Sequence, residues 1–248
     1  TLRTYSEAIA SIVALQMAQL QILEDFFDVP YHGARVMFGY SLGEITSLIA
    51  GGVIPLRCAL EIPLSLASDC VRLSEGVRLG ILFCRDHPLP LDEIQRLCIL
   101  VNQLGEGVMG ISTHLSPNSL LLMGEGRSLD HFKQQLMETV AQPIVLRKNK
   151  RRWPPLHTPI LYRLNIPNRA AEMMHRMPIR LQPPVPPVLS MVTGEPSYNS
   201  FNARELLHRW TDHPQRLWDV VYATLAMGID TVVHVGPEPN IIPSTYKR

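Results

Sequence analysis

The feature that most constrains the fold of this chain is the G-x-S-x-G pattern at residues 39–43, GYSLG. An apolar run at residues 35–38 precedes it, and a helical pattern at residues 45–50 follows it. Strand, tight turn and helix form the context in which a serine is raised above a sheet as a nucleophile. The glycines permit the sharp turn, and the helix N-terminus favours developing negative charge. A glycine-rich turn whose Ser41 only caps the helix is the alternative, and the context favours a serine acyl enzyme.

Composition narrows the class of protein. The 248 residues suffice for one large domain, or for one domain with an insertion. Hydrophobic residues make up 46% of the chain and the formal net charge is +1, so bulk charge gives no case for binding nucleic acid or a membrane. Apolar windows such as residues 9–23 are interrupted by Ser and Gln, and we expect them to be too polar to span a bilayer. These features predict a cytoplasmic enzyme.

The four cysteines are widely spaced and contain no C-x-x-C pair. This spacing is typical of ordinary buried thiols in a reducing compartment, not of a metal site or a disulfide framework. We therefore expect no metal and no tightly bound cofactor. The four are Cys58, Cys70, Cys84 and Cys98.

Residues 80–152 form a unit whose pattern differs from that of the flanking sequence. Apolar runs and helical patterns alternate there as strand, helix, strand, strand, helix, strand. This βαββαβ order predicts a ferredoxin-like subdomain with two helices on one face of an antiparallel sheet. The predicted elements are strands at 80–84, 108–114, 120–123 and 143–146, and helices at 91–104 and 129–140.

The flanking residues, 1–79 and 153–248, are predicted to form one large α/β subdomain that carries the elbow and receives the small unit as an insertion. A stiff Pro-rich spacer at residues 183–187 lies in its second half. The predicted helices are 6–27, 55–73, 167–177, 203–210 and 214–227, and the predicted strands are 35–38, 188–191 and 231–235.

A serine hydroxyl needs a neighbouring base before it can act as a nucleophile at neutral pH. Of nine histidines, His157 is preferred because it lies on a Pro-flanked segment where the chain returns to the large subdomain. The weaker candidates are His32, His114 and His175; for any single histidine, a surface or core role is the alternative.

No carboxylate that would orient the His157 ring is evident from the sequence. The acidic residue that follows it most closely is Glu172, on a different predicted helix. A backbone carbonyl could orient the imidazole instead, which would make a Ser–His dyad.

The chain resembles the malonyl-CoA:acyl carrier protein transacylase family, which includes the acyltransferase domains of fatty acid and polyketide synthases. The likeness runs from about residue 6 to the C-terminus. It rests on GYSLGE at 39–44, the glycines at 51–52, SPN at 116–118, LLLMG at 120–124, His157, PVLS at 187–190 and VGPE at 235–238.

This resemblance implies an α/β-hydrolase-like parallel sheet domain with an inserted ferredoxin-like subdomain. It also implies that Ser41, with His157 as base, attacks an acyl thioester of coenzyme A or of a carrier protein. The Leu42 amide would hold the oxyanion, and the acyl group would pass to the phosphopantetheine thiol of an acyl carrier protein. Other synthase domains are further possible partners. The residues expected at the substrate are Tyr40, Ala67 and Asn118.

Three departures from the family pattern matter. Nothing like the usual first strand with its Gly-Gln-Gly loop precedes residue 6, so only the Leu42 amide carries over as an oxyanion donor. Tyr40 stands where the family commonly has His. The Arg that clamps malonate, about 25 residues after the serine, has no counterpart in residues 64–68, although Arg57 and Arg72 flank this stretch. The sequence therefore predicts an acyltransferase that is not selective for malonyl groups.

Two other classes remain open: a serine thioesterase or hydrolase, and a catalytically impaired acyltransferase-like scaffold. The basic run at residues 147–152 could meet the phosphates of coenzyme A or an acidic carrier protein. Its alternative is a solvated loop between the subdomains.

Overall fold

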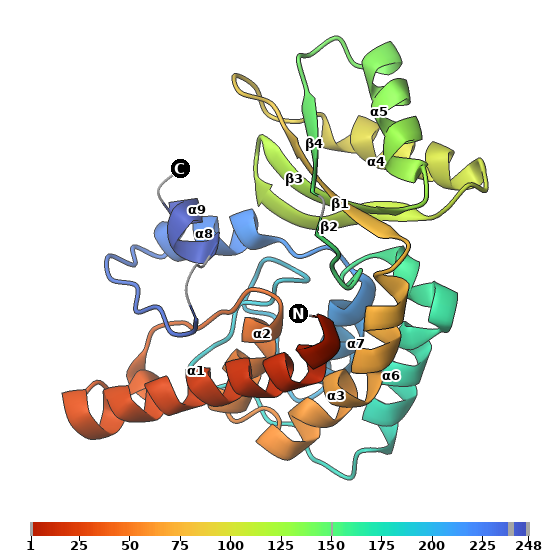
Figure 1. The fold of residues 1–248 in the computed structure, drawn as a ribbon. Coiled ribbons are helices and arrows are strands. Elements are labelled where there is room, and N and C mark those ends of the chain that lie inside the picture. The colour runs from red at the N-terminus through yellow and green to blue at the C-terminus, as the bar shows by residue number, and fades with distance from the viewer. Residues whose placement is uncertain (1, 150, 238–240, 247–248) are drawn as a thin grey trace.

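The computed structural model describes residues 2–149, 151–237 and 241–246. A four-stranded sheet with two helices on its outer face stands over a group of packed helices (Figure 1). The elements in chain order are η1 (Leu2–Thr4), α1 (Tyr5–Phe27), η2 (Tyr31–Gly33), α2 (Leu42–Ala50), α3 (Leu56–Leu73), β1 (Val77–Phe83), α4 (Leu91–Gln103), β2 (Met109–Ser116), β3 (Ser119–Glu125), α5 (Ser128–Thr139), β4 (Val145–Asn149), η3 (Pro159–Leu164), α6 (Ile166–Arg176), α7 (Ala203–Asp212), α8 (Leu217–Ala226) and α9 (Ile241–Tyr246).

The predicted strand–helix–strand–strand–helix–strand order of the middle of the chain is present. The four strands form one sheet in the order β2-β3-β1-β4, and each neighbouring pair is antiparallel. β1 begins at Val77, three residues before its predicted start, and β4 ends at Asn149, three residues beyond its predicted end. The strand ends thus differ from the prediction while the order agrees with it.

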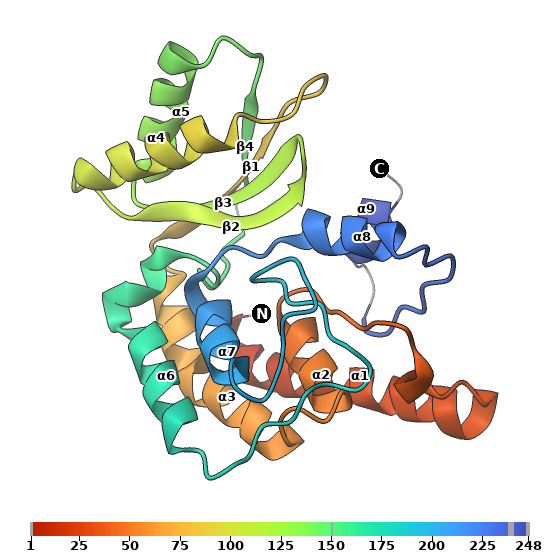
Figure 2. The same cartoon turned by 180° about the vertical axis from the view of Figure 1, so that it is seen from behind.

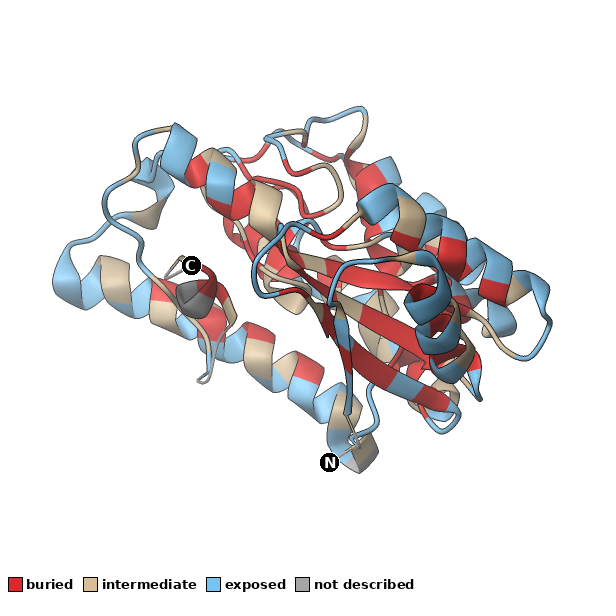
Figure 3. Cartoon of the chain, turned by 90° about the horizontal axis from the view of Figure 1, so that it is seen from above, coloured by how far each residue is buried: buried red, intermediate tan, exposed pale blue. Residues whose placement is uncertain are grey.

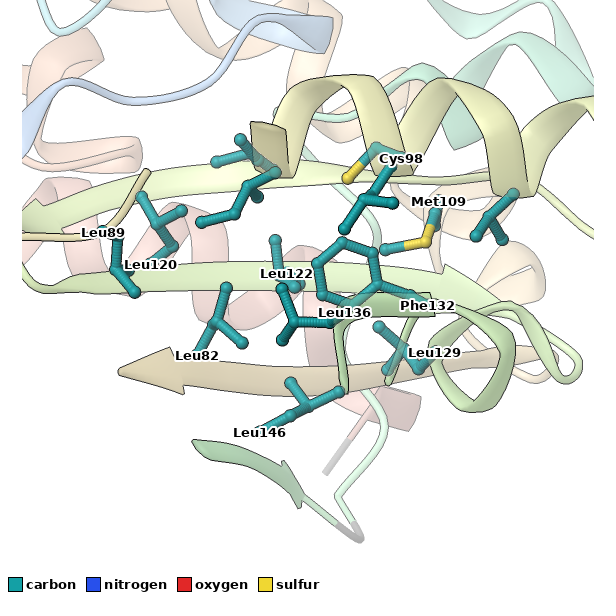
Figure 4. Packing of buried hydrophobic residues seen from close by; sticks show 14 of the residues in the cluster. Leu82, Leu89, Cys98, Met109, Leu120, Leu122, Leu129, Phe132, Leu136 and Leu146 are labelled. Carbon is teal, nitrogen blue, oxygen red and sulfur yellow. The ribbon is translucent and has the colours of Figure 1, made fainter. Parts of the chain in front are cut away.

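The two faces of this sheet pack against different partners, and strand β3 shows why. Leu120 and Leu122 are fully buried in a core with Phe132 of α5 and residues of α4 (Figure 4). Leu121 and Met123, on the opposite face, pack in a cluster with Ile160 of η3. Because successive strand residues point to opposite faces, an uninterrupted apolar run is needed to bury both.

The helices of the predicted large subdomain pack around α2. α1 packs on α2 and on α3, while α6 packs on α3 and α7. The connection between α6 and α7 passes alongside α2 (Figure 2), where the Val185 amide donates to the Gly51 carbonyl at 2.9 Å. Buried residues gather on the inward faces of these helices and in the sheet (Figure 3). The core thus holds α2 in place from several sides.

In the part of the chain that the structure describes, the predicted parallel sheet is represented by a single bridge. This parallel bridge joins Met37 and Val188. Residues 231–235 form no strand, although Thr, Val and His in this stretch favour an extended backbone. A cavity of about 920 Å³ lies between this stretch and residues 34–40, so the two segments do not meet to form a ladder.

Helix α1 differs from the expectation that its apolar stretch, residues 9–23, is too polar to span a bilayer. The helix has 23 residues, and the mean hydropathy of its most apolar 18-residue window is 1.3, so it is long and apolar enough to span a membrane; 22% of that window is buried in the protein. The interior helix of a globular protein satisfies the same criteria. The buried side chains Ile9, Val13, Gln16 and Leu20 follow one face of the helix.

The Phe132 side chain is fully buried in the core of the sheet and its helices, whereas Met137 on the same helix is 74% exposed. We expect Phe132→Ala to lower the free energy of unfolding by about 3–5 kcal/mol, because it leaves a cavity. Met137→Ala should change it by no more than about 0.5 kcal/mol. Denaturant titration of both variants tests this, and equal losses would contradict the packing described.

Candidate active site

The turn before α2 can be made only with glycine at residue 39. A Cβ added there would lie 2.1 Å from the carbonyl carbon and oxygen of Gly43, far inside van der Waals contact. Ser41 at the apex has φ 52° and ψ −116°, a conformation that L-residues rarely adopt and that costs about 1–3 kcal/mol. The predicted elbow is thus present, with α2 beginning directly after the serine.

The elbow brings Ser41 to His157. The distance from Ser41 Oγ to His157 Nε2 is 2.8 Å, and that from His157 Nδ1 to the Trp210 carbonyl oxygen is 2.6 Å. A carbonyl can only accept, so Nδ1 carries the proton and Nε2 is left to accept from the serine hydroxyl. The orienting group is therefore a backbone carbonyl, while Glu172 is bound to Arg176 on the surface.

The His157 side chain is buried, with an exposed fraction of 3%. Burial lowers the pKa of His157 from 6.5 to about 4, against smaller raising effects of the Trp210 carbonyl and of the Asp212 charge. The imidazole is therefore neutral near pH 7, which is the form that can take a proton from Ser41.

The backbone of Ser41 is bound on both sides by side chains from the α7–α8 region. The Ser41 amide donates to Gln215 Oε1 at 3.3 Å, and Trp210 Nε1 donates to the Ser41 carbonyl at 3.1 Å. Sequence reasoning missed Trp210 and Gln215, because Trp210 follows the pattern of a core helix and Gln215 lies in a short connection. The Leu42 amide has no partner among the described residues, which leaves it free to donate to a ligand.

Glu44, on the first turn of α2, anchors that helix to the α6–α7 connection. Its carboxylate accepts from the Tyr198 hydroxyl at 2.7 Å and from the Met191 amide at 3.0 Å. Complete burial raises the pKa of Glu44 to about 7, against the lowering effect of these hydrogen bonds.

A cavity of about 480 Å³ adjoins Ser41 and His157. Helices α1, α3, α6 and α7 line it together with residues of β1 and β3, and nearly all of the lining side chains are apolar. Among the described residues that line it there is no Lys, Arg, Asp or Glu. The cavity therefore suits an uncharged, apolar group.

The structure brings only some of the predicted substrate residues to this cavity. Tyr40 lines it, and its hydroxyl lies 2.8 Å from Thr113 Oγ1. Ala67 is buried but does not line the cavity; Leu66 does, because adjacent residues of a helix point about 100° apart. Asn118 lies in the β2–β3 turn, where its amide donates to the Cys84 carbonyl at 2.8 Å. Neither Ala67 nor Asn118 lines the cavity, so this geometry gives no support to their prediction as substrate residues.

The candidate cations flanking the missing clamp also lie away from the cavity. Arg57 is exposed, and Arg72 forms a surface ion pair with Asp69 at 3.2 Å. Neither residue lines the cavity.

The weaker histidine candidates lie elsewhere: His32 and His175 are exposed, and His114 is half-buried on β2. The first part of the basic run belongs to strand β4, where Arg147 lies over the Phe83 ring and Lys148 is bound to Asp130. Lys150 lies outside the described residues, and the last two residues of the run are exposed.

All four cysteines are free; three are buried, and the half-buried Cys58 lines the cavity. Within the described parts of the chain, no three His, Cys, Asp or Glu side chains gather as a metal site requires.

Comparison with known proteins relates this geometry to a family. No protein-family model matches the chain. A non-reducing polyketide synthase, sor2 of Hypocrea jecorina, is 27% identical over 129 residues, which is 52% of this chain and 5% of the synthase. The chain thus spans a small fraction of that curated relative.

Solved structures match over nearly the whole chain. FabD from Acinetobacter baumannii matches with a TM-score of 0.79 at 17% identity, over 99% of this chain and 74% of that one. The malonyl-CoA:acyl carrier protein transacylase of Xanthomonas oryzae pv. oryzae matches at 0.78 and 20%, over 100% and 74%. An acyltransferase domain of the salinomycin polyketide synthase matches at 0.78 and 18%, over 98% and 52%. The chain has the fold of the malonyl-CoA:acyl carrier protein transacylases, and the resemblance to that family is confirmed at the level of the fold.

Proposed function

We propose that this chain is an acyltransferase of fatty acid or polyketide synthesis. It moves an acyl group from a thioester of coenzyme A or a carrier protein, through an acyl-serine, to the phosphopantetheine thiol of an acyl carrier protein. The observation that carries the proposal is the 2.8 Å contact between Ser41 Oγ and His157 Nε2 beside an apolar cavity. The fold supports it, because the matching structures are described as transacylases and acyltransferase domains.

In the first step, His157 Nε2 takes the hydroxyl proton while Ser41 Oγ attacks the thioester carbonyl. The tetrahedral oxyanion forms near the Leu42 amide, at the N-terminus of α2. As the carbon–sulfur bond breaks, His157 gives its proton to the departing sulfur, which leaves as a thiol. In the second step, a phosphopantetheine thiol gives its proton to His157 and attacks the acyl-serine, and Ser41 recovers its proton as it leaves.

In the proposed organisation, residues 80–152 are a ferredoxin-like subdomain inserted into a large subdomain of residues 1–79 and 153–248. The antiparallel strand order β2-β3-β1-β4, with both helices on one face, supports the ferredoxin-like unit, and because β1 begins at Val77 the unit would start at that residue and not at residue 80. The exposed Arg151 and Arg152 would attract the phosphates of a coenzyme A thioester or the surface of an acidic carrier protein. The proposed site of this reaction is the cytoplasm.

The proposed acyl group is neutral. A malonyl carboxylate entering this cavity would meet no cation among the described lining residues, and Leu66, from the stretch in which the resemblance places the clamp, lines the cavity with an apolar side chain. An unpaired carboxylate in an apolar site costs several kcal/mol, and each 1.4 kcal/mol is about a factor of ten in rate. A cavity of about 480 Å³ instead accommodates an acetyl group or a longer chain.

Acyl transfer is distinguished from thioester hydrolysis by the fate of the acyl-serine. After the protein is mixed with acetyl-CoA, the acyl-serine should outlast the removal of excess thioester and should discharge rapidly when pantetheine or acyl carrier protein is added. An acyl-serine that decays at the same rate with and without thiol would indicate a hydrolase. A protein that is never acylated would indicate a scaffold.

Competition between acetyl-CoA and malonyl-CoA for Ser41 tests the acyl preference. We expect acetyl transfer to be faster by about tenfold or more, because the malonyl carboxylate finds no cation. Leu66→Arg should shift the preference toward malonyl, while Leu66→Met, a neutral control of similar size, should not. A malonyl preference in the unmodified protein would show that another cation reaches the site.

The acylation rate should be independent of pH from about pH 8 down to about pH 5 and should fall below about pH 4, since burial keeps His157 neutral. The unfolded chain takes up this proton below about pH 6.5 and the folded chain only below about pH 4, so stability should fall as the pH falls through this window.

His157→Ala should slow acylation by about 10²–10⁴-fold. A larger loss in His114→Ala than in His157→Ala would show that another group is the base, and an inflection of the rate near pH 6.5 would show that burial does not lower the pKa of the base.

A further inference from the structure

Ser41 adopts a strained backbone conformation, and its backbone polar groups are held by two side chains from distant parts of the chain. The Ser41 carbonyl already accepts from the Glu44 amide at 2.9 Å, as the first turn of α2 requires. It then accepts a second hydrogen bond, from Trp210 Nε1 at 3.1 Å. The Ser41 amide, which faces away from the helix, donates to Gln215 Oε1 at 3.3 Å.

Trp210 contacts both members of the reacting pair. Its indole N–H binds the Ser41 carbonyl, while its own carbonyl accepts from His157 Nδ1 at 2.6 Å. The indole ring also packs edge-on against the imidazole, with the ring centroids 5.0 Å apart and the planes at 85°. A movement of Trp210 would therefore change the orientation of the nucleophile and of the base together.

Gln215 is held by hydrogen bonds to the sheet. Its side chain is fully buried; its backbone N–H donates to the Ser112 carbonyl at 2.9 Å, and its backbone carbonyl accepts from the His114 amide at 2.8 Å. These bonds join it to β2, whose Thr113 hydroxyl also lies 2.8 Å from that of Tyr40. The side-chain amide nitrogen of Gln215 has no partner among the described residues, so the hydrogen bond to Ser41 is what orients this side chain there.

We propose that Trp210 and Gln215 are positioning residues that hold Ser41 in its reactive backbone conformation, with Trp210 also setting the ring of His157. The proposal rests on the function proposed above, because it takes Ser41 and His157 as the reacting pair. A displacement of about 1 Å in such a pair lowers the rate by about two orders of magnitude. The two residues therefore act on the rate through geometry, without touching the acyl group's reacting atoms.

A fluorophosphonate probe tests this directly, because it reacts with an activated serine and requires neither a thioester nor a carrier protein. Trp210→Phe keeps the ring and the backbone carbonyl but removes the indole N–H. We expect it to lower the second-order rate constant for labelling of Ser41 by about 10–100-fold. Gln215→Met, similar in size but without the acceptor, should lower it by about tenfold or more.

Trp218→Phe is the matched control, since Trp218 lies on α8 and does not line the cavity. It should label at the parental rate. In a His157→Ala background, Trp210→Phe should lower the labelling rate constant by less than about threefold, because the alignment of Ser41 with its base no longer matters once the base is removed. A purely structural role for Trp210 would leave its effect equally large in both backgrounds. Thermal unfolding of each variant checks the fold, and Gln215→Met keeps the test alive if Trp210→Phe does not fold.

Labelling of Trp210→Phe and Gln215→Met at the parental rate would overturn the proposal. So would equal losses in Trp210→Phe and Trp218→Phe, or an unmodified protein that the probe never labels. If the probe labels Ser41 but no acyl thioester does, the acyltransferase function fails, and the ratio of variant to parental labelling still decides the role of the two residues.

Discussion

The close approach of the backbone at Gly39 to that at Gly43 is the constraint on which the site depends. With a would-be Cβ at 2.1 Å from the opposing carbonyl, only glycine allows the chain to turn this sharply from Met37 and Phe38 into α2. The turn places Ser41 at φ 52°, and that conformation must be stabilised by the surroundings. The Ser41 conformation is stabilised by the hydrogen bonds from Trp210 and to Gln215. The buried hydrogen bonds of Glu44, in the first turn of α2, hold the helix that follows.

Strand β2 links the segments that carry Ser41 and His157 to the sheet. Its Thr113 lies against Tyr40, its Ser112 hydroxyl donates to the Leu156 carbonyl at 3.2 Å, and Gln215 pairs with its backbone. The residues before Ser41 and before His157 are thus tied to one strand. The sheet also contributes Leu79, Leu121 and Met123 to the cavity wall, so the same packing shapes the cavity and aligns the pair.

The elbow and the order of elements in the small unit were predictable from the sequence, because both depend on residues that are close together in the chain. The elbow needs only glycines at fixed spacing between an apolar run and a helix, and the βαββαβ order follows from periodicity. Trp210 and Gln215 could not be found in this way, because they meet Ser41 from 169 and 174 residues away. Sequence spacing alone could not tell whether Ala67 or its neighbour Leu66 faces the cavity, because adjacent residues of a helix point about 100° apart. The strand at residues 231–235 failed because β-propensity forms a strand only where a partner backbone lies alongside.

The proposed acyl transfer requires that Ser41, activated by His157, carries the acyl group as an ester. Peptide mass mapping of the protein, quenched in acid seconds after mixing with acetyl-CoA, tests this most directly. We expect an acetyl adduct on the peptide that contains residues 39–44, located on Ser41 by fragmentation and lost when pantetheine is added before the quench. An adduct on another residue, such as Cys58 in the cavity wall, or no adduct with any acyl thioester, would contradict it.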